Sequence, residues 1–228
     1  YSNEALWPLC HYTFKRPIFR LEDWEAYKRV NRRFAEEVAA IIGNRRAFIW
    51  VHDFHMCLFP KFLKELKGDN VFISHFWHIP WPSFEGFRIC PQKQEILEGL
   101  LANDLMGFQI TYHENNFIDG VERELECRVD HERRSIIRQD HQTFVRSYPI
   151  SIDFNEFNRQ AESSELKTMA DNLKSEFGIQ GQKIMVGVDR IDYTKGIPER
   201  LLAVDRLFEK HPELKEKAVF VQMGAISR

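Results

Sequence analysis

Two cations stand close together after an apolar run in the segment VGVDRIDYTKG, where Arg190 and Lys195 are five positions apart. The apolar run is typical of a buried strand, and Pro198 suits the first turn of a helix that follows directly. Backbone N–H groups at the start of that helix and two cationic side chains would point at one ligand, which indicates an anion such as a diphosphate. The alternative is that Arg190 pairs with Asp189 or Asp192 and that Lys195 lies in solvent.

A second group of polar residues follows two other apolar runs, with His52 and Asp53 in HDFH and His75 and His78 in HFWH. Histidines three positions apart beside an aspartate could ligate zinc or another divalent ion. Neighbouring side chains at a strand end alternate between faces, so His52 and Asp53 should not both point into one site, and we predict no metal here. The simplest alternative for His52 and His75 is a buried imidazole bonded to the backbone, and for Asp53 a helix N-cap.

Aromatic side chains stand beside prolines in two further segments. HIPWPS places two prolines around a tryptophan directly after His78, which predicts a rigid loop, either for positioning a ligand or as a plain turn. Trp7 precedes Pro8 in SNEALWPLCHY, where its ring could stack on a sugar or pack in the core. Packing is the simpler expectation.

Residues of these types need a scaffold, and the hydrophobic pattern predicts alternating helices and strands. Segment 21–42 repeats apolar residues at helical spacing, which predicts one amphipathic helix. Its expected buried face comprises Trp24, Tyr27, Val30, Phe34, Val38 and Ile41. Residues 47–51 form a short apolar run typical of a strand buried on both faces, and a second strand begins at Val71. Further helices are predicted over 57–67 with a start near Pro60, 93–104, 113–126, 161–178 and 197–211, and further strands over 183–188 and 218–224.

The chain turns polar from 128 to 147, and an extended segment with a proline, YPISIDFNEF, follows. We place the end of the first domain there, which gives domains 1–150 and 151–228. Strands that alternate with helices predict an α/β fold with parallel sheets and helices on their faces. The polar clusters follow strands, so they lie at the carboxyl ends where open parallel sheets bind ligands.

Composition excludes several classes of protein. The 228 residues are 43% hydrophobic, enough for globular cores, and a net charge of -2 provides no field for nucleic acid or a membrane surface, so neither is an expected partner. No apolar run approaches the ~20 residues that span a bilayer, and no P-loop, dinucleotide fingerprint or nucleophile elbow is present. The widely spaced cysteines argue against a zinc knuckle or disulfide framework and favour a reducing cytoplasm; they are Cys10, Cys57, Cys90 and Cys127.

Seven segments resemble, in order, the signature blocks of the trehalose-6-phosphate synthase family, glycosyltransferase family 20. They are SNEALWPLCHY, WVHDFHMCLFP, HFWHIPWPSFEGFRICP, EILEGLLANDLMGFQ, YPISIDF, GVDRIDYTKGIPERLLA and VFVQMGAISR. Any single block would be a weak signal, but their order and their coverage of nearly the whole chain are specific. The resemblance implies the GT-B fold, in which two Rossmann-like domains face across a cleft. Domain 1–150 would be the acceptor side, and 151–228 a linker and the start of the nucleotide-sugar-binding domain.

The implied activity is transfer of glucose from UDP-glucose, or another nucleotide sugar, to glucose 6-phosphate with retention at the anomeric carbon, without a metal or other cofactor. The resemblance assigns Arg190 and Lys195 to the donor diphosphate, where they would stabilise the charge of the leaving group. His78 would contact the donor sugar, and Asp53 would lie beside the acceptor, both acting through positioning and electrostatics. The acceptor-binding residues that it implies are Trp7, Asp53 and Arg228.

Departures from the family pattern leave alternatives open. Phe54 stands where the family has tyrosine, and PISID stands where PIGID is common, so glycerol 3-phosphate remains a rival acceptor. The family's amino-terminal glycine loop and its DGMNLVAKE-like ribose-binding block would lie outside the chain. We therefore expect a fragment with weak or absent turnover by itself, able to dimerise through an exposed strand edge. A non-catalytic, sugar-phosphate-binding regulatory subunit and a metal-dependent hydrolase built on the histidines are the remaining alternatives.

Overall fold

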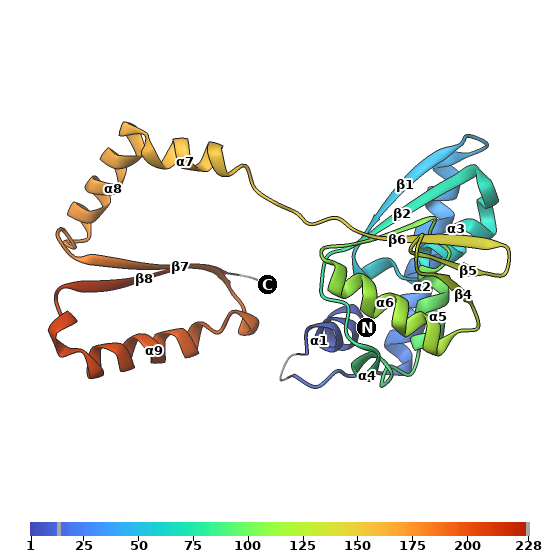
Figure 1. Ribbon diagram of the computed structural model, residues 1–228, viewed down its shortest axis with the longest axis horizontal. Coiled ribbons are helices and arrows are strands. Elements are labelled where there is room, and N and C mark those ends of the chain that lie inside the picture. Colours follow the sequence, from blue (N-terminus) through green and yellow to red (C-terminus); the bar gives the residue numbers. More distant parts are fainter. Residues whose placement is uncertain (13–14, 227–228) are drawn as a thin grey trace. The chain divides into compact units, whose positions relative to one another are not determined.

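The computed structural model describes residues 1–12 and 15–226 (Figure 1). The chain forms two compact units, Tyr1–Ile150 and Ser151–Arg228, and each contains its own β-sheet. The first unit carries a mixed six-stranded sheet, whereas the second carries a parallel pair of strands.

The sheet of the first unit has the order β1-β2-β3-β6-β5-β4, in which the first four strands are parallel, β5 pairs antiparallel with β6, and β4 pairs antiparallel with β5 at the edge. Its strands are β1 (Ala47–His52), β2 (Val71–Trp77), β3 (Leu105–Phe108), β4 (Arg128–Asp130), β5 (Ser135–Arg138) and β6 (His141–Ser147). The predicted parallel sheet is confirmed. Two parts were missed: the four-residue β3, and the three antiparallel strands β4, β5 and β6 inside the segment that was interpreted as a polar domain end. Ser135 and Thr143 are buried there despite being polar, which hides the strand pattern.

The helices predicted over 21–42, 57–67, 93–104 and 113–126 are confirmed as α2 (Leu21–Ile42), α3 (Phe59–Lys67), α5 (Lys93–Leu100) and α6 (Thr111–Glu124). Short helical turns that had not been predicted are η1 (Ser2–Leu6), α1 (Trp7–His11), η2 (Phe54–Met56), η3 (Gly68–Asn70) and α4 (Phe84–Phe87). Helix α3 begins next to Pro60, as its position in the first turn requires. Helices α2 and α3 cover the sheet face that carries Val51, Val71 and Ile73.

The buried face of α2 differs from the predicted one beyond its first two turns. Trp24 and Tyr27 are buried, but Val30, Phe34 and Ile41 are exposed. The positions that face the core instead are Asn31, Ala35, Ala39 and Ile42. Small alanines allow the helix to approach the sheet closely. Asn31 is held there because its Oδ1 accepts the backbone N–H groups of Leu58 and Phe59.

Strand β1 is covered on one face rather than on both. Phe48 and Trp50 are 65% and 62% exposed, while Val51 on the other face is buried under α2 and α3. The prediction of a strand buried on both faces was wrong because a continuous apolar run does not reveal which face receives a helix.

The second unit contains the predicted helices and strands, together with one α-helix and two short 3₁₀ turns that were not expected. Its elements are α7 (Phe154–Glu162), α8 (Ser164–Glu176), β7 (Lys183–Ile191), η4 (Tyr193–Lys195), α9 (Ile197–Lys210), η5 (Pro212–Leu214) and β8 (Ala218–Ile226). The segment expected to be extended becomes helical at Phe154, because Asp153 caps α7 by accepting the N–H of Glu156 at 3.0 Å. In Figure 1, α8 and α9 lie on opposite sides of the β7–β8 pair.

Candidate functional site

Asp53 has a strained backbone at the carboxyl end of β1. Its φ of 64° with ψ of -175° is a conformation that residues other than glycine rarely adopt, and such strain persists where surrounding bonds enforce it. Three hydrogen bonds to residues at the end of β2 hold Asp53 in this conformation. The N–H of Asp53 donates to Phe76 O at 2.8 Å, its carbonyl accepts from His75 Nε2 at 2.9 Å, and its Oδ1 accepts the N–H of His78 at 3.2 Å. The carboxylate is thereby held against His78.

His75 is a fully buried imidazole bonded to the backbone, as predicted. Because Nε2 must donate to the Asp53 carbonyl, Nδ1 is the acceptor, and it faces Asn103 Nδ2 at 3.4 Å. Burial lowers the pKa of His75 to about 4. The ring is therefore neutral at physiological pH and supports the Asp53 backbone without adding charge to the site.

His52 departs from its prediction. It is exposed, and its Nδ1 lies 2.9 Å from Nε2 of His78. Asp53 also contacts His78, but through the backbone N–H of that residue, whereas His52 contacts the ring. Alternation holds only within a strand; β1 ends at His52, and the positive φ of Asp53 redirects the chain. Asp53 does precede the short helix η2, but its side chain makes no capping bond.

Trp7 lies on α1, where it packs against the main core cluster and keeps part of its surface exposed. Its ring stacks on His11 with centroids 3.7 Å apart. The preceding turn, η1, contacts η2, which directly follows Asp53. Burial raises the pKa of the Cys10 thiol on α1.

Arg190 and Lys195 stand around a tight turn at the carboxyl end of β7. The Asp192 carboxylate organises this turn by accepting the N–H of Thr194 at 2.9 Å and its hydroxyl at 2.8 Å. Those bonds, and then the positive charges of Arg190 and Lys195, lower the pKa of Asp192. The other neighbouring carboxylate, Asp189, is bound by Arg200 Nη1 at 2.6 Å.

A helix begins directly after this turn, as predicted. Gly196 has φ of 61°, which favours glycine, and α9 starts at the next residue with Pro198 in its first turn. A hollow of about 490 Å³ lies beside it, lined by residues at the end of β7, in η4, at the start of α9 and in β8: Ile191, Asp192, Tyr193, Ile197, Pro198, Gln222 and Gly224. Arg190 and Lys195 are not among these lining residues, so the position that suits an anionic ligand is the turn that carries the two cations at the start of α9, not the hollow itself.

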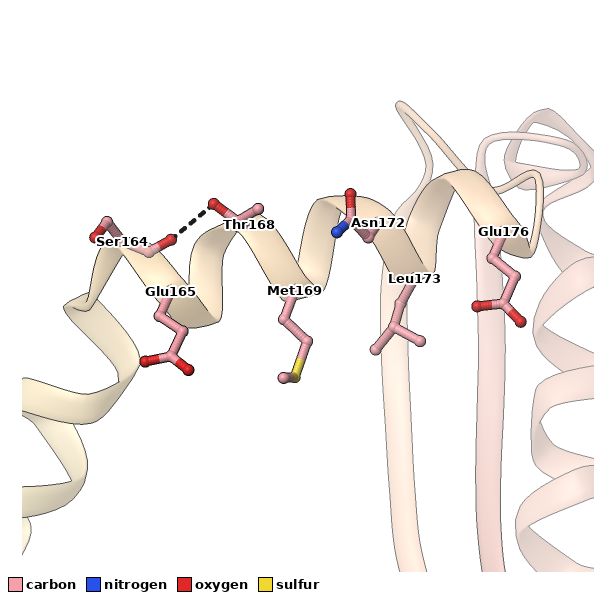
Figure 2. A pocket seen from close by; sticks show the side chains of 7 residues that line it. All are labelled: Ser164, Glu165, Thr168, Met169, Asn172, Leu173 and Glu176. Atoms are coloured by element: carbon pink, nitrogen blue, oxygen red, sulfur yellow. Dashed lines mark hydrogen bonds between the residues drawn. The ribbon is translucent and has the colours of Figure 1, made fainter.

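A second hollow in the same unit, of about 460 Å³, has no such chemistry (Figure 2). All its lining residues lie along α8, and Figure 2 shows Glu165, Met169 and Leu173 projecting from one side of that helix. Carboxylates on a helix face without convergent donors do not form a site for a phosphorylated ligand.

The structure brings Asp53 and His78 together in the first unit and sets Arg190 and Lys195 on one turn in the second. Arg228 lies outside the described residues. Within residues 1–12 and 15–226, no three histidine, cysteine, aspartate or glutamate side chains are arranged to hold a metal ion. The same part of the chain contains no helix long and apolar enough to cross a bilayer.

Sequence reasoning missed His52 as the partner of His78. The parallel register pairs His52 with Phe76, so His78 stands two residues further along on the same face. Given that register, the alternation of side chains would have placed the two rings together.

In each of the two α/β units, polar and charged side chains stand at the carboxyl ends of parallel strands, the place where open α/β sheets commonly bind ligands. The fold is GT-B, and the chain covers about half of the GT-B structures to which it is similar. Glycosyltransferase family 20 matches residues 1–228, and the chain belongs to that family.

Individual relatives agree with this assignment. The chain is 38% identical over 232 residues to an α,α-trehalose-phosphate synthase [UDP-forming] of Pichia angusta and to the 56 kDa subunit of that synthase in Saccharomyces cerevisiae, and it covers 48% and 46% of them. It is similar, with a TM-score of 0.87 and 30% identity, to a Burkholderia xenovorans synthase in complex with glucose-6-phosphate, and with a TM-score of 0.86 and 32% identity to an E. coli protein bound with UDP-2-fluoro glucose. All of this chain and 50% and 49% of those chains are covered. The chain thus spans about half the length of the relatives it matches.

Proposed function

We propose that the full-length protein containing this chain is a retaining glucosyltransferase of trehalose biosynthesis. It transfers glucose from UDP-glucose, or another nucleoside diphosphate glucose, to glucose 6-phosphate and releases trehalose 6-phosphate and the nucleoside diphosphate. The main support is that the whole chain is 38% identical to α,α-trehalose-phosphate synthases [UDP-forming]. In addition, Asp53 and His78 follow strands β1 and β2, and Arg190 and Lys195 stand at the end of β7, where ligand-binding residues are expected.

The two units have different roles in this proposal. The first, residues 1–150, is the acceptor-side domain, where Asp53 and Trp7 contact glucose 6-phosphate and His78 contacts the donor sugar. The second, from residue 151, binds the donor diphosphate through Arg190, Lys195 and the N–H groups at the start of α9. Arg228 is assigned to the acceptor phosphate.

The chemical step follows from these roles. The bond between the anomeric carbon and the diphosphate oxygen breaks, and Arg190 and Lys195 stabilise the negative charge that develops on the leaving group. The acceptor hydroxyl attacks from the same face, which retains the configuration, and its proton passes to the leaving phosphate oxygen. Asp53 and His78 orient the sugars, so no side chain needs to act as a general base or nucleophile. No cofactor is needed.

Two further parts of the proposal concern the environment. The four cysteines of the chain are free thiols, and three of them are buried, which supports a reducing, cytoplasmic location. We also propose that the full-length protein forms a homo-oligomer, and sedimentation of that protein tests this point.

The decisive experiment is a coupled assay of the full-length protein that follows UDP release from UDP-glucose in the presence of EDTA. Glucose 6-phosphate is the acceptor, and glycerol 3-phosphate is the rival. Release that requires glucose 6-phosphate and survives EDTA supports the proposal. Release only with glycerol 3-phosphate would change the acceptor, and binding of sugar phosphate without release from any donor would favour a regulatory subunit. Residues 1–228 by themselves should turn over weakly or not at all.

A further inference from the structure

His52, which has no role in the function proposed above, meets the ring of His78 at the carboxyl ends of β1 and β2. His52 Nδ1 and His78 Nε2 are 2.9 Å apart, and the ring planes meet at 30°. A hydrogen bond between two imidazole nitrogens requires one N–H and one lone pair. The tautomers of the two rings are therefore coupled, and Nδ1 is the nitrogen of His78 that remains for another partner.

The surroundings hold this pair in place. The Trp50 ring lies against His52 with centroids 4.6 Å apart, and the Phe76 ring meets His78 edge-on at 4.8 Å. The backbone of His78 is anchored as well, because its N–H donates to the strained Asp53. Two flanking aromatic rings and one backbone bond make this contact different from a chance meeting of exposed side chains.

We propose that His52 is a positioning residue that sets the tautomer and ring orientation of His78. His78 is exposed, so water would compete for both of its nitrogens and its ring would rotate if His52 did not occupy Nε2. With Nε2 occupied, Nδ1 is the nitrogen presented to the ligand, as a donor when Nε2 accepts the bond and as an acceptor when Nε2 donates it. The effect on catalysis rests on the proposed function, in which His78 contacts the donor sugar. The coupling of the two rings does not depend on that function.

Two substitutions in the full-length protein separate positioning from packing. His52→Ala removes the partner of His78, while His52→Asn keeps an amide that can donate or accept near the position of Nδ1. We expect His52→Ala to lower kcat for glucose transfer about tenfold, the size of one hydrogen bond, with the KM for glucose 6-phosphate changed less than about threefold. His52→Asn should recover most of that loss. His131→Asn replaces an exposed histidine of the β4–β5 connection and should leave the rate unchanged.

The imidazole ¹⁵N chemical shifts of His78 provide a readout that does not depend on activity. In the native protein one nitrogen should show the shift of an N–H and the other that of a lone pair. His52→Ala should average the two, and His52→Asn should restore the difference. Unchanged His78 shifts in His52→Ala, or equal kcat in all variants, would overturn the proposal. If the native protein transfers glucose to no acceptor, the proposed function fails, while these shifts still decide whether His52 sets the state of His78.

Discussion

The two units of the chain contain similar helices and strands but differ in how they bury apolar surface. The first unit buries two clusters of hydrophobic side chains on and around its six-stranded sheet. In the second unit, none of the hydrophobic side chains between 151 and 226 is buried, and Val186 and Val188 on β7 are 56% and 69% exposed. Hydrogen-bonded elements can form from local pattern alone, whereas the free energy that stabilises them comes mostly from burial. A two-stranded sheet cannot supply that burial.

The largest expected effect is in amide hydrogen exchange of the 228-residue chain. Amides of β1, β2 and β3 exchange through opening of a packed core, while those of β7 and β8 need only local opening, so we expect the latter to exchange at least about a thousandfold faster. Mass spectrometry of peptic fragments measures both at once. Equal protection of the two sheets would break the comparison.

The second prediction compares the kinetics of the two substrates that the proposed function assigns to the two units. Arg190→Ala in the full-length protein should lower kcat/KM for UDP-glucose by about two to three orders of magnitude, because a preorganised charge at the leaving group is lost. Asp53→Asn should instead act mainly on the kinetics of glucose 6-phosphate. The measurement is initial rate with each substrate varied in turn. Arg206→Ala, on the exposed surface of α9, is the matched control and should leave both substrates unaffected.

A matched pair of leucines tests the difference in burial directly. Leu63 on α3 is fully buried, and Leu202 on α9 is 69% exposed. Leu63→Ala should lower the free energy of unfolding by about 2–5 kcal/mol, whereas Leu202→Ala should change it by no more than about 0.5 kcal/mol. Urea titration with a probe of each unit gives both values, and a larger loss for Leu202→Ala would contradict the description of the second unit.

The smallest expected effect is a dependence of stability on pH that belongs to the first unit. The folded pKa of His75 is about 4 against an ordinary value of 6.5, so between these values the unfolded chain binds the proton and the folded chain does not. Stability from this group is therefore complete above pH 6.5 and falls as the pH drops to 4, by up to about 3 kcal/mol.

Unfolding midpoints of the first unit between pH 4 and 7 check this prediction. His75→Phe should flatten the slope over that range, since it removes the titrating ring and keeps an aromatic side chain of similar shape. His211→Asn, which replaces an exposed histidine of the second unit, should leave the slope of the first unit as it was. A slope that survives His75→Phe would assign the pH dependence to other groups.

The elements themselves could be predicted to a large extent. The helix at 21–42, the strand from Val71 and the helix that starts after Gly196 all follow from residues close together in the chain, and the structure contains each of them. The three antiparallel strands β4, β5 and β6 could not be predicted from the sequence, because their buried face includes the polar residues Ser135 and Thr143. Thr143 is acceptable there since its hydroxyl donates to the Leu101 carbonyl at 2.7 Å, a partner 42 positions away.

Local signals in the sequence were enough to predict the α/β order of the chain and the turn that carries Arg190 and Lys195, because a strand end, a glycine and a helix start lie there within seven residues. Only the tertiary structure decided the arrangement around His78. That arrangement depends on the parallel register of β1 against β2 and on the positive φ of Asp53, both of which are set by bonds between segments more than twenty residues apart. The covered face of β1 was decided in the same way, since burial depends on where α2 and α3 pack rather than on how apolar the strand is.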